Sequence, residues 1–388
     1  MTVEFFGTPV RRVTDEPKYH FFGYYDKSPW DIRDHYILSL QTSFEDHPPR
    51  PEDEAVIGIL DPEDNYAFKI LTVTHAWNWQ QGCMLQWIPG FENRIIFNDR
   101  EKGKYVSVIL DIESGDSYKL EMPVYALSHD GSKALTLNFS RLAWTRPGCG
   151  YAGIPDPYAG DKAPDDDGIY ILDLRSGESE LIISLGQMAR FKPRSDMKGA
   201  VHWFNHLLFN QDDDRFIFLH RWSYEPGRTW RTRLFTADIN GGNVCLLVDG
   251  RASHFDWRDS RHVLAWAYMN GIGERFFLFR DKSEDFEIVG DGVLTRNGHC
   301  SYSPDRKWIL TDTYPDENNM QKLMLYNPCE DRLVEIGRFY SKPELRGEIR
   351  CDLHPRWSRR GDRICIDSTH EGTRQMYVID VSEIVEVR

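Results

Sequence analysis

Histidines recur in this chain at positions that follow a repeated strand pattern, and they are the side chains best suited to chemistry. His206 and His220 flank two apolar runs joined by the acidic segment 211–214. Apolar alternation on both sides of a polar turn is typical of an antiparallel hairpin, so we expect both histidines at the same end of one hairpin. Aligning later hairpins on their turns adds further histidines at positions equivalent to that of His206. They are His254, His299 and His354.

Imidazoles that gather at one place favour two kinds of chemistry. With carboxylates they bind a divalent metal such as Zn or Mn, and a single imidazole held by its neighbours acts as a general base. Asp256 and Asp352 lie two residues from His254 and His354 and could complete either arrangement. The alternative is that each histidine bonds a backbone carbonyl at a strand end. Because a fold has no packing need for histidine at equivalent positions, we predict a metal site. Its predicted ligands are His206, His220, His254, His299 and His354.

One earlier segment contains residues that suit a sugar site. His75 is followed by Trp77, Gln80 and Gln81, in a run of amide and aromatic side chains similar to the aromatic run after His20. We predict that Trp77, Gln80 and Gln81 bind substrate and that His75 is catalytic. The alternative is that these side chains only cap a channel.

A second segment combines an arginine and a tyrosine with glycines. Arg146 and Tyr151 enclose Gly148 and Gly150, within a segment (138–167) that is too long for an ordinary blade loop. Arginine pairs with a carboxylate through two hydrogen bonds, and an activated tyrosine moves protons. We therefore predict that Arg146 and Tyr151 are catalytic, in a loop that folds over the site. The alternative is a plain surface loop.

The elements that must position these residues are short strands in a repeated pattern. Turns of the first hairpins include Ser128-His129-Asp130-Gly131 and Ser303-Pro304-Asp305. Four strands that recur roughly every 45–55 residues are typical of one blade of a β-propeller. Seven such units span residues 1–388, the last ending in a strand at 384–387. We therefore predict an all-β, single-domain, seven-bladed β-propeller with four antiparallel strands per blade, whose first strands bring the histidines to the mouth of the channel.

Composition and charge limit the classes of partner. The net charge of −14 argues against nucleic acids and anionic membranes, because both require a basic surface. The seven cysteines show no paired spacing, which favours a reducing compartment. We see neither a signal peptide nor a run apolar enough to span a bilayer. These observations predict a cytoplasmic monomer, or a periplasmic or secreted protein if a leader has been removed.

Three segments of the later blades resemble the oligogalacturonate lyases, which are seven-bladed propellers that cleave uronate oligosaccharides by β-elimination. They are Ser253-His254-Phe255-Asp256-Trp257, Gly298-His299-Cys300-Ser301-Tyr302-Ser303-Pro304-Asp305 and Leu353-His354-Pro355-Arg356-Trp357-Ser358. The resemblance implies that His254 is the base that removes the proton and that His299 and His354 hold a manganese ion. The chain departs from the family at Asp352-Leu353-His354-Pro355, where the family has His-Pro-His-Pro. It also shows no counterpart of the family's additional glutamine ligand.

The first half of the chain is more similar to the ulvan lyases and related propeller lyases. The similarity rests on the segment that begins at His75 and on Phe22-Gly23-Tyr24-Tyr25-Asp26. In those enzymes histidine, tyrosine and arginine do the chemistry and a separate metal is structural. A pair spaced like His206 and His220 is similar to part of that metal site. The two resemblances leave open which residues bind metal and which are catalytic.

These observations together predict a uronate-specific polysaccharide or oligosaccharide lyase that works by β-elimination. Its partner would be a uronate-containing glycan and its cofactor a divalent metal, Zn or Mn. Arg146 or the metal would neutralise the substrate carboxylate, and His75, Tyr151 or His254 would remove the C5 proton. One alternative is a non-catalytic propeller that binds a glycan or a protein at its mouth. Another is a glycoside hydrolase, which needs two carboxylates that face each other across the channel.

Overall fold

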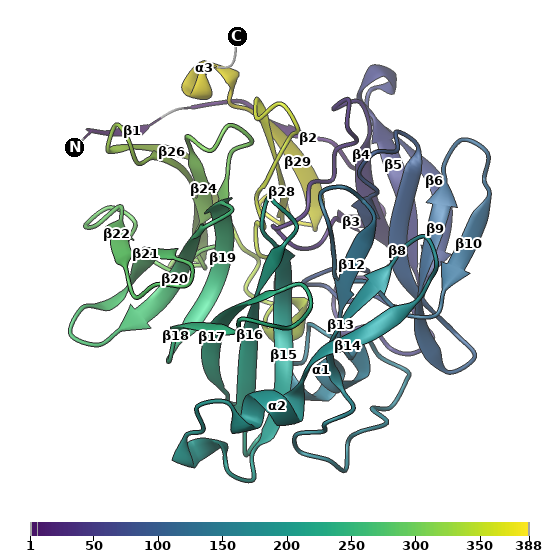
Figure 1. The fold of residues 1–388 in the computed structure, drawn as a ribbon. Coiled ribbons are helices and arrows are strands. Elements are labelled where there is room, and N and C mark those ends of the chain that lie inside the picture. Colours follow the sequence, from purple (N-terminus) through teal and green to yellow (C-terminus); the bar gives the residue numbers. More distant parts are fainter. Residues whose placement is uncertain (1, 6, 387–388) are drawn as a thin grey trace.

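The chain folds into seven β-sheets arranged in a ring (Figure 1). This computed structural model describes residues 2–5 and 7–386. Each sheet contains one blade of four antiparallel strands, and the first strand of a blade lies against the central channel. The prediction of an all-β, seven-bladed propeller is confirmed. In the described part of the chain no helix is long and apolar enough to cross a membrane.

The first four blades follow one another in chain order. Blade 1 contains β3 (Tyr19–Phe21), β4 (Ile37–Thr42), β5 (Ala55–Asp61) and β6 (Ala67–Thr74). Blade 2 contains β7 (Gln86–Trp87), β8 (Arg94–Glu101), β9 (Lys104–Asp111) and β10 (Ser117–Leu120). Blade 3 contains β11 (Ala126–Leu127), β12 (Lys133–Thr136), β13 (Gly168–Asp173) and β14 (Ser179–Ser184). Blade 4 contains β15 (Val201–Phe209), β16 (Arg215–Ser223), β17 (Arg231–Asp238) and β18 (Cys245–Val248).

The last three blades continue in the same direction around the ring. Blade 5 contains β19 (Ala252–Asp259), β20 (His262–Met269), β21 (Gly273–Arg280) and β22 (Phe286–Val289). Blade 6 contains β23 (Ser301–Tyr302), β24 (Ile309–Asp312), β25 (Met320–Asn327) and β26 (Arg332–Tyr340). Blade 7 receives β27 (Arg356–Trp357), β28 (Arg363–Ser368) and β29 (Gln375–Asp380) from the end of the chain.

The N-terminal segment closes the ring. β2 (Val10–Arg12) pairs antiparallel with β29 and is the outer strand of blade 7. β1 (Thr2–Phe5) pairs in parallel with β26 and adds a fifth strand to blade 6. The expectation of a last strand at 384–387 is wrong for its described residues, because β2 already occupies the free edge of β29. Ser382–Val385 forms the short helix α3 instead, and residue 387 lies outside the described part.

Two segments that are too long for ordinary blade loops contain helices. α1 (Phe139–Thr145) follows β12, and the Asn138 side chain caps it by accepting a hydrogen bond from the Arg141 amide. α2 (Leu185–Arg190) and the 3₁₀ turn η2 (Ser195–Met197) connect blades 3 and 4. Shorter 3₁₀ turns occur at η1 (Pro62–Asp64) and η3 (Gly347–Ile349). Figure 1 shows α1 and α2 on the side of the ring where β15 begins.

Apolar residues fill the spaces between neighbouring blades. Ile217 of blade 4 packs with Phe255 and Trp257 of blade 5 in one cluster, and Leu323 of blade 6 packs with Ile364 of blade 7 in another. Because each blade supplies one face to each neighbour, the blades form a rigid frame around the channel. That frame fixes the positions of the side chains at the inner ends of the first strands.

Candidate functional site

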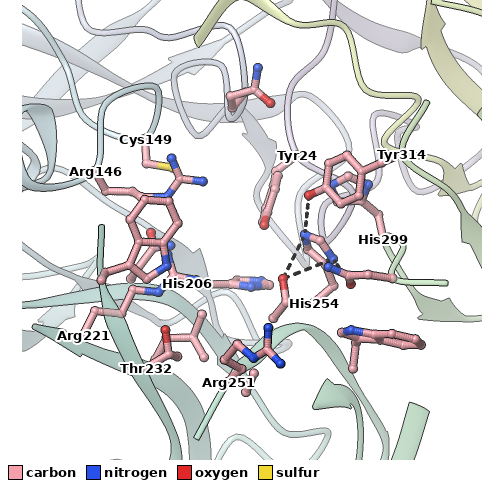
Figure 2. Close-up of a pocket in the computed structure, with 18 of the residues that line it drawn as sticks. Tyr24, Arg146, Cys149, His206, Arg221, Thr232, Arg251, His254, His299 and Tyr314 are labelled. Atoms are coloured by element: carbon pink, nitrogen blue, oxygen red, sulfur yellow. Dashed lines mark hydrogen bonds between the residues drawn. The ribbon is translucent and has the colours of Figure 1, made fainter. Parts of the chain in front are cut away.

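A cavity of about 340 Å³ lies at one mouth of the channel (Figure 2). This volume is within the usual range for small-molecule sites. Blades 4, 5 and 6 supply most of its wall, and Arg146, Cys149, Gln80 and Arg350 close it on the other side. The wall also includes Tyr24, His206, Arg221, Trp230, Arg251, His254, Glu274, Asn297, His299 and Tyr314.

Three of the predicted histidines meet beside this cavity. The ring centroids of His254 and His299 are 4.1 Å apart, and those of His299 and His354 are 4.4 Å apart. His254 lies in β19, His299 just before β23 and His354 just before β27, so each comes from the first strand of a successive blade. His206 also lines the cavity but is separated from this group, in contact with Tyr24 at 5.0 Å between ring centroids.

Two of these histidines have an unusual backbone. His206 has a φ of 53° and His354 a φ of 41°, both in the left-handed region that non-glycine residues seldom adopt. Such a conformation costs roughly 1–3 kcal/mol and persists only when its surroundings enforce it. In β15 the left-handed turn at His206 coincides with a bulge in the pairing between Asn205 and Leu207. The bulge turns the His206 side chain towards the channel.

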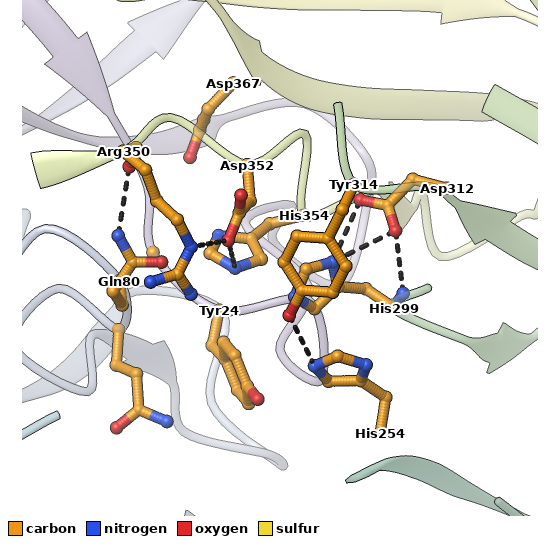
Figure 3. A network of polar contacts seen from close by, with 12 residues as sticks. Tyr24, Gln80, His254, His299, Asp312, Tyr314, Arg350, Asp352, His354 and Asp367 are labelled. Atoms are coloured by element: carbon orange, nitrogen blue, oxygen red, sulfur yellow. Dashed lines mark hydrogen bonds and ion pairs between the residues drawn. The ribbon is translucent and has the colours of Figure 1, made fainter. Parts of the chain in front are cut away.

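His254 has the hydrogen-bonding pattern of a general base. Its Nδ1 lies 3.1 Å from Oδ1 of Asn297, an acceptor, so the proton of the neutral ring resides on Nδ1. Nε2 then keeps its lone pair, 3.4 Å from the hydroxyl of Tyr314 (Figure 3). Burial, and next the charge of His299, hold the pKa of His254 well below its usual value. The ring is therefore neutral and able to accept a proton.

Ligands for a metal ion lie next to His254. His299, Asp352 and His354 each offer one ligand atom, and these atoms all lie within 4.8 Å of one another. The Nδ1 of His299 donates to both oxygens of Asp312, at 3.0 and 2.9 Å, which leaves Nε2 free (Figure 3). A carboxylate that orients a ligating imidazole in this way is a common partner of metal-bound histidine.

The donor set fits a divalent cation. The Nε2 of His354 is buried and has no hydrogen-bond partner, a costly state that a metal ion would relieve. Asp352 accepts from Nε of Arg350 at 2.7 Å, so its carboxylate is held in place beside the imidazoles. Two imidazoles and one carboxylate suit Zn or Mn and leave positions open for a substrate.

His206 and His220 do not form one site. His220 lies opposite Phe204 in the β15–β16 pairing, and its Nε2 is 2.9 Å from Nδ1 of His202. Because side chains alternate along a strand, the next residue, Arg221, lines the cavity while His220 faces the interior of the blade. His206 instead places Nε2 3.2 Å from Oδ2 of Asp26. The prediction that His206 and His220 are metal ligands is therefore not supported by the structure. Among the described residues, the group that could hold a metal ion contains neither of them.

Arg146 and Tyr151 are separated although they share one segment. Arg146 lines the cavity, as predicted. Tyr151 is fully buried, stacks on Phe139 with ring centroids 4.5 Å apart and accepts a hydrogen bond from Asn98 at 3.0 Å. Burial raises the pKa of Tyr151 well above its usual value. The phenol has no route to a substrate in the cavity, so we correct its predicted catalytic role to a structural one.

Replacing Tyr151 with phenylalanine tests this correction. The change removes one buried hydrogen bond and should lower the free energy of unfolding by about 1–3 kcal/mol, because Asn98 keeps an unsatisfied amide. Turnover per folded molecule should stay within about twofold, since the ring and its packing are retained. Denaturant titration and steady-state kinetics measure the two effects. A loss of turnover without loss of stability would restore the catalytic role.

Only part of the segment that begins at His75 reaches the cavity. His75 is half-buried and lies 3.8 Å from Asp99, outside the set of cavity-lining residues. Trp77 donates from Nε1 to the Asp53 carbonyl and packs in the core. Gln81 donates to the hydroxyl of Tyr125 at 2.9 Å. The predicted contacts of His75, Trp77 and Gln81 with a ligand in this cavity are therefore not available.

Gln80 is the residue of this segment that reaches the cavity. Its Nε2 donates to the carbonyls of Glu348 and Arg350, both at 2.9 Å, and so ties blade 2 to the loop before blade 7. The Oε1 atom of Gln80 is buried without a partner. Gln80 therefore lies where it can contact a ligand, and its substrate-binding role stays a prediction.

Several residues that line the cavity are not among the site residues predicted from the sequence. Tyr24 contacts the rings of His206, His299 and His354 at the centre of the site, and it occupies the blade 1 position that matches those histidines. That equivalence is a signal that the sequence contains. Arg221 and Tyr314 carry no such signal, because nothing in their local sequence separates them from other strand residues.

Comparison with known proteins finds similarity in the fold and no match by sequence. The sequence matches no protein-family model and no curated protein. The structure is similar to that of oligogalacturonate lyase from Vibrio parahaemolyticus, with a TM-score of 0.69 and 14% identity over 98% of this chain and 95% of that one. An oligogalacturonate lyase in complex with manganese gives a TM-score of 0.70 and 14% identity, over the same shares of 98% and 95%.

A different kind of protein shares the architecture less closely. The β-propeller domain of the Trilobed protease from Pyrococcus furiosus gives a TM-score of 0.51 and 11% identity, over 89% of this chain and 90% of that one. At such low identities, likeness establishes a common architecture and leaves activity to be argued from the site. The chain is a seven-bladed β-propeller that shares its fold with the oligogalacturonate lyases.

Proposed function

We propose that this protein is a uronate-specific polysaccharide or oligosaccharide lyase that cleaves by β-elimination. The observation that carries the proposal is the state of His254: neutral, with its proton held on Nδ1 by Asn297 and its Nε2 lone pair at the cavity wall. Such a base can remove a carbon-bound proton only where a neighbouring group makes that proton acidic. The ligand group of His299, Asp352 and His354 stands next to it.

The proposed chemistry assigns a role to each neighbour of His254. His299, His354 and Asp352 would hold a divalent cation, which when bound supplies the positive charge that neutralises a uronate carboxylate. His254 Nε2 takes the proton from C5, and the electrons of that C–H bond form the C4–C5 double bond. The C4–O4 bond breaks, its electron pair leaves on O4, and O4 takes a proton from the phenol of Tyr24 or Tyr314. Tyr24 and Tyr314 place phenol groups at this cavity.

The geometry argues against a glycoside hydrolase. That reaction needs two carboxylates flanking the scissile bond, about 5–10 Å apart. Glu274 is the only carboxylate among the described cavity-lining residues, and it pairs with Arg251 at 3.3 Å. The facing pair of carboxylates that this alternative requires is therefore missing from the cavity wall.

The geometry also argues against a purely non-catalytic scaffold. That alternative predicts histidines that are dispersed or bonded to backbone carbonyls. Instead, the ring hydrogen bonds of His254 and His299 within the described residues are to side chains, and His354 Nε2 has no hydrogen-bond partner. A buried nitrogen without a hydrogen bond is costly, and a scaffold with no metal would not offset that cost.

An elimination assay tests the proposal. The purified full chain is incubated with a panel of uronate glycans, with no added metal and with added Mn or Zn. The conjugated C4–C5 double bond of the product absorbs ultraviolet light, and we expect its absorbance to increase with at least one glycan. No increase with any glycan under any of these conditions would contradict the proposal.

A further inference from the structure

Two arginines and a tryptophan form a second cationic part of the cavity wall. The guanidinium carbon of Arg146 lies 4.5 Å from the centre of the Trp230 ring, and that of Arg221 lies 5.6 Å from it. Both arginines line the cavity, as does the indole. We call Arg146, Arg221 and Trp230 the arginine–tryptophan wall.

Neither arginine of this wall is paired with a carboxylate. Arg146 donates from Nη1 to the neighbouring Pro147 carbonyl, and no ion pair or side-chain hydrogen bond involves Arg221 among the described residues. The Nε atoms of both are buried without an acceptor. Two other buried arginines of the propeller are neutralised, since Arg233 meets Asp249 at 2.7 Å and Arg356 meets Asp367 at 2.7 Å, whereas buried Arg374 bonds the Ile349 carbonyl.

Arg221 is buried and Arg146 is partly exposed. An unpaired guanidinium is costly to bury, and a second cation nearby raises that cost. Burial, and next the charge of Arg146, lower the pKa of Arg221 to about 10, so the Arg221 guanidinium remains charged at neutral pH. Burial raises the pKa of Glu348 although the charge of Arg146 opposes that shift, and the Glu348 carboxyl forms no ion pair with Arg146. No carboxylate of the described residues therefore pairs with the two arginines of the wall, and an anionic ligand can supply the negative charge that they lack.

The position of the wall shows which anion this is. Figure 2 places Arg146 and Arg221 on one side of the cavity, and His254, His299 and Tyr314 on the other. The carboxylate that activates C5 is bonded to C5 itself and must lie close to His254. It therefore lies on the imidazole side, and a group bound by the arginines belongs to another part of the substrate.

We propose that the arginine–tryptophan wall is a subsite for a second, anionic sugar, one that bears a carboxylate or a sulfate and is linked to the uronate at which elimination occurs. Arg146 and Arg221 bind the acidic group through charge-assisted hydrogen bonds. The indole of Trp230, which is 38% exposed, covers a face of the same sugar ring. The inference rests on the proposed function for the identity of the reacting uronate, whereas the binding of an anionic sugar can be measured without turnover.

Calorimetric titration of the full chain with glucuronate tests the subsite, because a monosaccharide has no glycosidic bond to cleave. We expect glucuronate to bind and methyl glucoside, its uncharged counterpart, to bind at least about tenfold more weakly. Arg221→Gln and Arg146→Gln should each weaken glucuronate binding by about tenfold or more. Trp230→Leu should weaken it about fivefold and leave the binding of inorganic sulfate unchanged.

Arg228→Gln is the matched control, because Arg228 is exposed on the same β16–β17 connection and does not line the cavity. Its effect should stay within about twofold. Equal losses in Arg228→Gln and Arg221→Gln, or equal affinity for glucuronate and methyl glucoside, would overturn the subsite. If Arg221→Gln fails to fold, Arg146→Gln makes the same test at a partly exposed position.

A second titration distinguishes the source of the anion. Comparing the affinities of glucuronate and glucose 6-sulfate shows whether the arginines prefer a carboxylate or a sulfate. Either preference supports the subsite if Arg146→Gln abolishes it. Failure of the subsite and failure of the proposed function remain distinct. Arginine-dependent glucuronate binding without elimination of any glycan would keep the subsite and reject the lyase, and elimination without arginine-dependent binding would do the reverse.

Discussion

Replacing His254 with alanine is expected to lower kcat/KM for uronate elimination by about 10²–10⁴-fold, the usual contribution of a positioned general base. The effect should fall mainly on kcat, because Nε2 of His254 acts on the C5 proton in the transition state and contributes little to binding the substrate. Steady-state measurement of the unsaturated product gives both parameters. The metal content of the variant should match that of the wild type, since His254 is outside the ligand group.

His262→Ala provides the control for this experiment. His262 lies in the same blade, is half-buried and pairs with Asp259 at 2.8 Å, away from the cavity. Its removal should change kcat/KM by less than about twofold. If His254→Ala kept most of the activity, the base would have to be sought elsewhere at the cavity, and the proposed division of roles would be wrong.

Removal of the divalent metal is expected to have an effect of similar size. Stripping the protein with a chelator should lower elimination about a thousandfold, since neutralising a carboxylate in a closed site contributes several kcal/mol to the transition state. Adding back Mn or Zn should restore the activity. Elemental analysis and kinetics on the same samples check both statements.

Variants locate the ion. His299→Ala should lose most of the bound metal, and Asp312→Asn should weaken its binding about 10–100-fold, because Asp312 orients the His299 ring. His206→Ala should retain the metal, since His206 bonds Asp26 instead. Equal metal content in His299→Ala and the wild type would refute the ligand group. Loss in His206→Ala alone would return the site to the position first predicted from the sequence.

The propeller could be predicted because its signals are local and repeated. Turns such as Ser303-Pro304-Asp305 fix a hairpin wherever they occur, and aligning them put His254, His299 and His354 at matching strand positions. Their convergence then follows from the ring alone. Closure by β2 has no local signal, because Val10-Arg11-Arg12 is short and mostly charged, and nothing in it shows that it pairs with the far end of the chain.

Register and pairing limited the prediction of the site. Residue type alone favours His220, but a shift of one residue along a strand reverses the side that a side chain faces, and Arg221 has the cavity position. Tyr151 was chosen for its glycine-rich setting. In the structure, a side chain at Gly150 would collide with Ala143 of α1, so that glycine allows close packing rather than a mobile loop. Arg221 was missed because the absence of a partner is a property of three dimensions.

Closure of the ring by the N-terminal strand has a consequence for biosynthesis. Tyr24 comes from the first blade to emerge from the ribosome, whereas Asp352 and His354 come from the last, and β2 must wait for β29 before it can pair. Contacts this distant in sequence form late in folding. A nascent or truncated chain that lacks blade 7 would contain His254 and His299 but neither Asp352 nor His354, so the ligand group is complete only when the last blade has been made.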